Sequence, residues 1–177
     1  MKIGLFYGTD TGNTETISKE IRKKLDAKFG EGTVEMKEIY KKKAEEMQAY
    51  DLLILGMPTW YDGELQADWE DFIPEMEKIN FEGKKVAFFG LGDQYGYAAY
   101  FCDALGVFAD IVEKNKGQIV GLWPTEGYEF DHSKALKGDK FVGLCLDVDN
   151  QDELTNERVD KWLEQILGEF GIAQSSN

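Results

Sequence analysis

Apolar and polar positions along the chain predict strands and helices in alternation. Two continuous apolar runs, Asp51–Gly56 and Lys85–Gly90, are typical of strands that are buried on both faces. Lys2–Tyr7 is a third strand-like run, whereas Thr33–Ile39 alternates apolar and polar residues and predicts a half-covered edge strand. Strands that are buried on both faces belong to sheets with helices on either side.

Helical patterns, each with an apolar stripe on one side, separate these strands. They cover four segments: from about Asn13 to Gly30, Asp68–Lys78, from about Tyr100 to Lys114, and a last segment from about Thr155. Pro74 should end or kink the second helix, because proline lacks the N–H group of a helical turn. Thr155 is a good N-cap for the last helix, and Ala173–Asn177 should be frayed.

The fifth strand is interrupted. Gln118–Leu122 and Phe141–Leu146 both have a strand pattern, and the loop-like residues Trp123–Lys140 separate them. Strands alternating with helices predict a mostly parallel sheet in one α/β domain, residues 1–177, with an insertion at about 123–140. Ligands of such sheets bind beyond the carboxyl ends of the strands. The loops to inspect are therefore Gly8–Asn13, Met57–Ala67, Leu91–Ala99 and Asp147–Asp152.

Composition narrows the class of protein. The chain has 177 residues, of which 42% are hydrophobic and 31% charged, as in a globular domain. No apolar run approaches the roughly 18–20 residues that span a bilayer, and the first strand pattern begins without a signal peptide. Cys102 and Cys145 lie in apolar runs without metal-ligand spacing, which favours buried free thiols. We therefore expect a cytoplasmic protein without membrane insertion.

The net charge of −14 is distributed unevenly. Residues 19–43 carry nine basic and five acidic side chains, whereas residues 60–80 carry seven acidic side chains and one basic one. Nucleic acid is not an expected partner, because phosphates need a basic face. An acidic face attracts basic proteins, although acidity also serves solubility alone.

The first of the four loops, GTDTGNT at residues 8–14, contains glycines, three threonines and Asn13 but no Lys or Arg. It lies between a strand and a helix, where free N–H groups and the helix dipole bind phosphate. A Walker loop would carry Gly-Lys before Ser or Thr, and the dinucleotide spacing G-x-G-x-x-G is absent. The loop suits a terminal monophosphate, or it is an ordinary turn capped by Asn or Thr.

The other loops carry aromatic and acidic side chains. MPTWYDGELQADW contains Trp60, which is either a stacking platform for a flat ring or a core residue under a folded loop. GLGDQYGYAAY has glycines that allow close backbone approach, tyrosine faces, and Asp93, which could accept from a ring N–H; the alternative is a flexible loop with solvent-facing tyrosines. Asp147 could accept from a sugar hydroxyl or cap the turn that follows.

Together these segments resemble a known family. GTDTGNT, PTWYDGE and GLGDQYGY, in this order and at these spacings, resemble the three FMN-binding loops of flavodoxins, and WPTEGYEF, KFVGL and LDVDNQ extend the match. The interrupted fifth strand resembles the long-chain subgroup. The resemblance implies a three-layer α/β/α sandwich with a five-stranded parallel sheet in the order 2-1-3-4-5, for which flavodoxin is itself the standard example, and FMN between strands one and three.

The resemblance also implies roles for matching residues. The phosphate loop comprises Thr9, Asp10, Thr11, Gly12, Asn13 and Thr14. The segment over one face of the isoalloxazine ring comprises Pro58, Thr59 and Trp60, and the residues at its other face are Tyr97 and the nearby Tyr100. The turn that hydrogen-bonds flavin N5 is Tyr61, Asp62 and Gly63, and the contacts to the pyrimidine edge are Leu91, Gly92 and Asp93. Asp147 matches a residue near the ribityl or phosphate end.

The implied function is low-potential transfer of single electrons by non-covalently bound FMN, without a catalytic residue or a metal. Basic redox proteins, such as a flavodoxin or ferredoxin reductase and low-potential acceptor enzymes, would dock on a monomer at the acidic surface around Glu64, Asp68, Glu70 and Asp71. One rival is an FMN enzyme such as a quinone reductase, which needs space over the flavin for nicotinamide. The other is a receiver-type signalling domain, which needs a phosphorylatable Asp and a strand-end Lys; no such Lys is evident.

Overall fold

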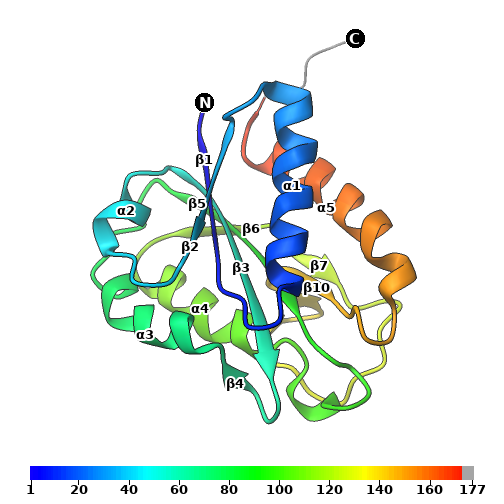
Figure 1. Cartoon of the computed structure of the whole chain (residues 1–177). Helices are drawn as coiled ribbons and strands as arrows, with labels where there is room; N and C mark the ends of the chain where they lie inside the picture. The colour runs from blue at the N-terminus through cyan, green and yellow to red at the C-terminus, as the bar shows by residue number, and fades with distance from the viewer. Residues whose placement is uncertain (173–177) are drawn as a thin grey trace.

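A parallel sheet runs through the middle of the computed structural model, which describes residues 1–172 (Figure 1). The sheet order is β2-β1-β3-β5-β10, and β6 also pairs with β5. These strands are β1 (Ile3–Tyr7), β2 (Val34–Glu38), β3 (Leu52–Trp60), β5 (Lys85–Leu91), β6 (Gln118–Val120) and β10 (Leu144–Leu146). The fraying expected for Ala173–Asn177 concerns residues outside the described part.

This arrangement confirms the predicted order 2-1-3-4-5. The fifth position is shared by two strands that lie end to end along β5: β6 pairs with Lys85–Ala87, and β10 pairs with Phe89–Leu91. The predicted interruption of the fifth strand is therefore real. The sheet is parallel at every one of these pairings, and only the short β4 (Glu64–Leu65) joins it antiparallel, next to the end of β3.

Helices cover both faces of the sheet (Figure 1). They are α1 (Asn13–Phe29), α2 (Ala44–Gln48), α3 (Ala67–Met76), α4 (Asp103–Lys114) and α5 (Thr155–Glu169). On one face α1 and α5 lie side by side, joined by the Lys24–Asp160 ion pair. On the other face α3 and α4 pack through Trp69 and Phe108, whose ring centroids are 5.0 Å apart. No helix among residues 1–172 is long and apolar enough to cross a membrane.

The start of α4 and the predicted capping role of Thr155 differ from the prediction, whereas α5 begins at Thr155 as expected. A 3₁₀ turn, η1 (Ala98–Tyr100), precedes α4, and the left-handed backbone of Cys102 (φ 54°) separates the two, so α4 begins at Asp103 and not near Tyr100. Another 3₁₀ turn, η2 (Asp152–Leu154), runs directly into α5, so Thr155 is the first helical residue and makes no cap hydrogen bond. The N-cap prediction for Thr155 was wrong, because the preceding turn already continues the helix.

The helix α3 ends shortly after Pro74, as predicted. Pro74 lies in its last turn with an exposed ring, and the helix ends at Met76, two residues earlier than expected.

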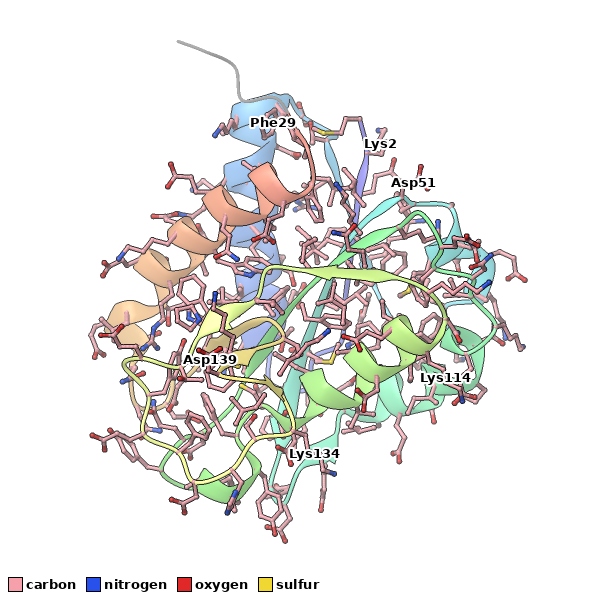
Figure 2. All side chains as sticks on the ribbon, turned by 180° about the vertical axis from the view of Figure 1, so that it is seen from behind. Lys2, Phe29, Asp51, Lys114, Lys134 and Asp139 are labelled. Atoms are coloured by element: carbon pink, nitrogen blue, oxygen red, sulfur yellow. The ribbon has the colours of Figure 1, made fainter. Side chains whose placement is uncertain are left out.

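The insertion is more ordered than its loop-like sequence indicates. It forms a small antiparallel sheet in the order β7-β9-β8, with β7 (Trp123–Pro124), β8 (Leu136–Lys137) and β9 (Lys140–Phe141). Figure 2, which shows the molecule from behind, places Lys134 beside the start of α4, at the opposite end from Lys114. There the Lys134 N–H donates to Asp103 Oδ1 (2.7 Å), and the Asp131 and His132 N–H groups donate to the Ala98 carbonyl (2.8 and 3.0 Å). The insertion thus braces η1 and the start of α4.

Candidate functional site

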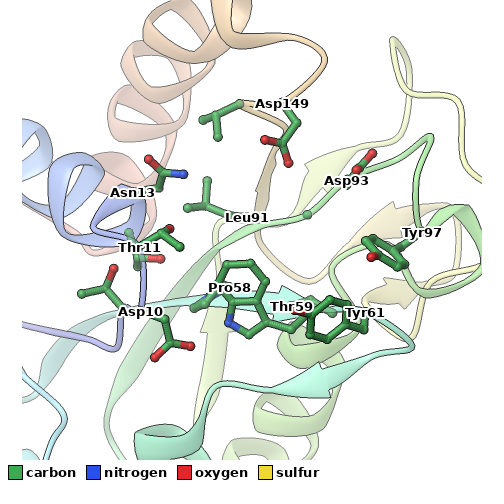
Figure 3. Close-up of a pocket in the computed structure, with 15 residues that line it drawn as sticks. Asp10, Thr11, Asn13, Pro58, Thr59, Tyr61, Leu91, Asp93, Tyr97 and Asp149 are labelled. Atoms are coloured by element: carbon green, nitrogen blue, oxygen red, sulfur yellow. The ribbon is translucent and has the colours of Figure 1, made fainter.

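A cavity of about 220 Å³ lies beyond the carboxyl ends of β1, β3 and β5 (Figure 3). The chain leaves β1 toward β2 on one side and β3 toward β5 on the other, so this is the point where the strand order reverses and ligands of such sheets bind. Fifteen residues line the cavity, and thirteen of them are predicted site residues. These are Thr9, Asp10, Thr11, Asn13, Thr14, Pro58, Thr59, Trp60, Tyr61, Leu91, Gly92, Asp93 and Tyr97.

One end of the cavity, here called the hydroxyl end, is built by the loop between β1 and α1. Gly12 has a left-handed backbone (φ 92°) that suits glycine, and its N–H donates to Thr9 Oγ1 (2.9 Å). Thr9 therefore holds the turn, yet its hydroxyl hydrogen stays available to donate. Thr11, Asn13 and Thr14 also line this end, at the start of α1, and no Lys or Arg does. Free N–H groups at a helix start and neutral donors suit a phosphate group.

The other end, here called the aromatic end, is built by the loops after β3 and β5. Trp60 is the last residue of β3, Tyr61 begins the loop after it, and Tyr97 comes from the loop after β5. The Tyr61 and Tyr97 rings meet edge to face with centroids 5.8 Å apart, and Figure 3 shows both at the end opposite Asn13. Flat aromatic rings seat well against such side chains. The Trp60 Nε1 atom is buried and has no hydrogen-bond partner among the described residues.

The turn that carries Tyr61 has an unusual backbone. Trp60 pairs with Glu64 across the β3–β4 ladder, so residues 61–63 form the connecting turn. Tyr61 adopts a left-handed φ of 42°, which is uncommon for a residue with a side chain, and Gly63 has a φ of 84°. A Cβ atom on Gly63 would lie only 2.9 Å from Asp103 Oδ2. Gly63 is therefore required by the turn and by the start of α4.

Two carboxylates on the cavity wall have opposite environments. Burial raises the pKa of the Asp93 carboxyl, but hydrogen bonds from the Gly96 N–H (2.7 Å), the Asn150 side chain (2.8 Å) and the Tyr95 N–H (3.1 Å) outweigh it and leave the pKa below its ordinary value. Burial, followed by the charges of Asp93 and Asp147, raises the pKa of Asp149. The cavity wall beside Leu91, Gly92 and Asp93 is thus acidic, and its carboxylates lie close enough to repel one another.

Five predicted site residues do not line the cavity: Gly12, Asp62, Gly63, Tyr100 and Asp147. Gly12 and Gly63 shape the turns described above. Asp62 is exposed at the tip of the β3–β4 turn, and Tyr100 lies on η1 with 37% of its surface exposed. Their direct contact with a ligand stays a prediction.

Asp147 has a different place from the one predicted. Its carboxylate is fully buried and accepts from the backbone and side-chain N–H groups of Gln94 (3.1 and 2.8 Å) and from those of Asn150 (3.1 and 2.9 Å). A carboxylate whose acceptor sites are used in this way caps the turn, which was the alternative left open by the sequence. Its role is to join the loop after β5 to the loop after β10.

Val148 and Asp149 line the cavity and were not predicted. They directly follow Asp147 in the loop after β10, which is one of the four loops expected at the ligand site. Their position in that loop is the sequence feature from which they could have been predicted.

The cavity can hold a flat molecule that ends in an anion. It offers hydroxyl and N–H donors at one end and aromatic faces at the other. Among residues 1–172, no group of three or more His, Cys, Asp and Glu side chains could hold a metal ion. His132, the single histidine, is exposed in the insertion and is not among the residues that line the cavity. The arrangement is therefore suited to binding, orienting and shielding such a molecule.

Comparisons with known proteins agree with this geometry. The sequence model of the flavodoxin family matches residues 5–162. The chain is 53% identical to a flavodoxin of Haemophilus influenzae over 97% of both chains, and 53% identical to flavodoxin 1 of Escherichia coli K12 over 98% of this chain and 97% of that one. Its fold is similar to that of a Fusobacterium nucleatum flavodoxin bound to flavin mononucleotide, with a TM-score of 0.87, 34% identity, and coverage of 95% of this chain and 98% of the other.

Proposed function

The chain belongs to the flavodoxin family, and from that premise we propose that it carries single electrons between redox partners on non-covalently bound FMN. The observation that carries the proposal is the two-ended cavity. Neutral hydroxyl donors at a helix start face one end, and Trp60 and Tyr97 face the other. FMN has the matching parts, a terminal phosphate and a flat ring, and structures of relatives hold it.

The residues present fit this cofactor. Thr9, Thr11 and Thr14 would donate to the phosphate, and the start of α1 would add backbone N–H groups. Gly92 lines the cavity and would offer its backbone to the pyrimidine edge; glycine is needed there because a Cβ atom would lie only 3.0 Å from Phe101 Cδ1. Asp93, with its pKa held low, is ionised at neutral pH and is an acceptor for a ring N–H.

The surroundings of the ring would set a low potential. FMN supplies the redox chemistry by taking up and releasing one electron at a time. No Lys or Arg lines the cavity, so no positive side chain there would compensate the negative charge of the reduced ring. Asp93 and Asp149 lie on the cavity wall, and the whole chain has a net charge of −14. A like charge at about 6 Å costs on the order of 3 kcal/mol at an effective dielectric of about 20 before screening. Since roughly 1.4 kcal/mol corresponds to about 59 mV in a one-electron couple, even a fraction of this repulsion lowers the potential measurably.

The Tyr61–Asp62 peptide is our candidate partner for flavin N5. It lies in the turn that follows Trp60, next to the aromatic end, and both Tyr61 and Gly63 are in the left-handed region. A change in the orientation of this peptide rotates ψ of Tyr61 and φ of Asp62, and Gly63, which has a permissive backbone, is the next residue of the turn. Its carbonyl would accept from a protonated N5, and such a hydrogen bond would favour the addition of one electron over the addition of two.

Docking would use the acidic surface beside the aromatic end. Glu64, Glu70 and Asp71 are exposed and Asp68 is partly exposed, and all four lie on β4 or α3. We propose that a basic reductase and low-potential acceptor proteins bind there, as monomer to monomer. Charge attraction between exposed groups is screened by salt, so raising the salt concentration should slow reduction by a basic partner; rates independent of salt would contradict this part.

We propose that the protein acts in the cytoplasm. Cys102 and Cys145 are buried free thiols, and burial raises the pKa of Cys145 well above its ordinary value, which makes it a poor nucleophile and suits a reducing compartment.

The proposal is tested by the colour and cofactor content of the purified protein. We expect a yellow protein with one FMN per chain, and no rapid oxidation of NADPH by the isolated protein, because Trp60 and Tyr97 would cover both faces of the ring. Rapid NADPH oxidation would favour the quinone-reductase alternative. A colourless protein that does not take up FMN would contradict the proposal and favour the receiver-type alternative.

A further inference from the structure

Gln66 is a buried amide that the function described so far does not use. It lies between β4 and α3, is only 1% exposed, and uses its oxygen as the N-cap of α3 by accepting from the Trp69 N–H (3.1 Å). Its Nε2 donates to two carboxylates, Asp10 Oδ1 (3.2 Å) and Asp68 Oδ2 (2.9 Å). Asp10 belongs to the loop at the hydroxyl end, so this side chain links that loop to the start of α3.

The packing around Gln66 is tight. A Cβ atom on Gly8 would lie 2.3 Å from Gln66 Oε1 and 2.6 Å from Trp69 Cδ1, so only glycine fits at the start of the loop. The Trp69 Nε1–H and the Gly8 N–H both donate to the Gly56 carbonyl (2.9 and 3.2 Å). The end of β1, the middle of β3 and the start of α3 are therefore joined at one place.

Gln66 also lies between the two loops that carry Asp10 and Trp60. Its backbone directly follows β4, which pairs with Thr59 and Trp60. Its side chain reaches Asp10 on the other loop. A groove lined by Asp10, Thr11, Trp60, Tyr61, Glu64 and Leu65, among others, separates the two loops on their outer side. The Gln66–Asp10 hydrogen bond is thus a bridge from one loop to the other.

The Gln66–Asp10 hydrogen bond offsets an unfavourable negative charge at the hydroxyl end. Asp10 is a carboxylate that lines a site proposed for a phosphate dianion, and like charges at close range repel. Figure 3 shows the Asp10 side chain on the side of its loop away from Asn13. The Gln66 amide, a neutral donor held in place by the Trp69 N–H, keeps the Asp10 carboxylate turned toward α3.

We propose that Gln66 is a positioning residue that sets the preference of this site for a phosphorylated flavin over the same flavin without phosphate. The inference rests on the proposed function. Without the amide donor, the Asp10 carboxylate is free to turn toward the phosphate and the hydroxyl end loses its fixed shape. The ring-binding residues lose nothing directly, so the change falls on the phosphate.

Gln66→Glu and Gln66→Met test this on the apoprotein with FMN and riboflavin as the two probes. Gln66→Glu keeps the size of the side chain and the cap acceptor, but it removes the donor and faces two carboxylates. Gln66→Met removes the donor without adding charge. The matched controls are Gln165→Glu and Gln165→Met, because the half-buried Gln165 of α5 also donates to two acceptors, Leu122 O and Glu169 Oε1 (both 2.8 Å).

The measured quantity is the ratio of the riboflavin Kd to the FMN Kd, followed by quenching of protein or flavin fluorescence. We expect both Gln66 variants to lower this ratio about tenfold or more, which is the size of one lost charge-assisted contact, and both Gln165 variants to leave it within about twofold. Gln66→Glu combined with Asp10→Asn exchanges donor and acceptor across the bridge and should restore most of the preference.

Unchanged ratios in both Gln66 variants would overturn the inference, as would equal losses for FMN and riboflavin, which would indicate a purely structural role. Failure of the Asp10→Asn rescue would also count against it. Urea unfolding of each apoprotein shows whether the variant is folded. If the unaltered protein binds neither flavin, the proposed function fails, and that result differs from every outcome that overturns the role of Gln66 alone.

Discussion

The two ends of the cavity are built in different ways. The hydroxyl end is one short segment, residues 9–14, in which a left-handed glycine, a helix start and neighbouring threonines act together. The aromatic end combines Trp60 at the end of β3 with Tyr61 and Tyr97 from two loops, and it depends on a strained turn and on the insertion that braces η1. The first end is encoded locally, whereas the second exists only in the folded chain.

This difference has a functional meaning. A locally encoded anion site keeps its shape as long as one strand and one helix keep theirs. An end that is assembled from several loops can adjust when the charge of its ligand changes, because loops are the less stable parts of a fold. The hydroxyl end should therefore govern how tightly the phosphate is held, and the aromatic end should govern how the ring responds to reduction.

Thr11→Asp should give the largest difference between the loss of FMN affinity and the loss of riboflavin affinity, because it alters the hydroxyl end alone. The new carboxylate would place a negative charge beside the phosphate, and at a few ångströms this costs on the order of 2–3 kcal/mol, or roughly 100-fold in FMN affinity. The same carboxylate at a helix start stabilises the apoprotein slightly. Titration with FMN and riboflavin, together with urea unfolding, measures both effects.

The matched control is Thr16→Asp, which adds the same charge further along α1, outside the cavity. It should lower FMN affinity by less than about fivefold. An equal loss in both variants would show that the loop does not hold the phosphate.

Trp60→Ala tests the aromatic end. Loss of a stacked indole should weaken binding by about 2 kcal/mol, or roughly 30-fold. Because Trp60 is proposed to stack on the ring and lies at the end away from the phosphate loop, FMN and riboflavin should lose affinity equally, in contrast to Thr11→Asp. Tyr97→Ala should follow the same pattern with a smaller loss, since Tyr97 is already 37% exposed. A loss confined to FMN would contradict the division of the site into two ends.

Tyr61→Gly tests the strain in the turn. A side chain at φ 42° is held in the left-handed region, and glycine adopts that region freely. We expect relief of this strain to raise the free energy of unfolding of the apoprotein by about 0.5–1 kcal/mol. Loss of the edge-to-face contact between Tyr61 and Tyr97 offsets part of this gain. Urea unfolding at fixed temperature measures the change, and Tyr95→Gly, at an exposed residue of the other loop, is the control. A clear loss of stability in Tyr61→Gly would mean that the ring contact outweighs the strain.

The two wall carboxylates should shift stability in opposite directions by small amounts. The pKa of Asp149 is raised, so its ionised form is unfavourable in the folded state. Asp149→Asn should therefore raise stability at neutral pH, and the gain should vanish as the pH falls below about 3.8, the ordinary value. The pKa of Asp93 is lowered, so Asp93→Asn should reduce stability at neutral pH, and that loss should fade as the pH falls below the same value.

Each change should be on the order of 0.5 kcal/mol, as is usual for partly exposed groups. Unfolding of the apoprotein between pH 3 and 7 distinguishes the two residues. Slopes of the same sign for both variants would contradict the assignment of their environments.

Much of the fold could be predicted from the sequence because its signals are local. The buried runs of β3 and β5 marked the central strands, and GTDTGNT indicated a strand-to-helix loop that suits an anion or is an ordinary capped turn. The fifth strand could be recognised as interrupted from its two apolar pieces.

The misplaced residues depend on partners that are distant in sequence. The resemblance matched Asp147 to the ribityl or phosphate end of a ligand, with a turn cap as the alternative; its carboxylate accepts from Gln94, which is 53 residues away, and no local pattern shows that pairing. The role of Gln66 could not be predicted from the sequence, because its partner Asp10 is 56 residues away. Thr155 is a residue type that often caps helices, but the 3₁₀ turn η2 runs directly into α5 and makes Thr155 a helical residue.

Stepwise reduction of the purified protein, followed by visible spectra, tests the central claim most directly. An electron carrier of the proposed kind should pass from the yellow oxidised form through a distinct one-electron-reduced form, which accumulates near half reduction, before it becomes colourless. Direct bleaching in proportion to two electrons, with no intermediate spectrum at any stage, would contradict single-electron transfer by this site.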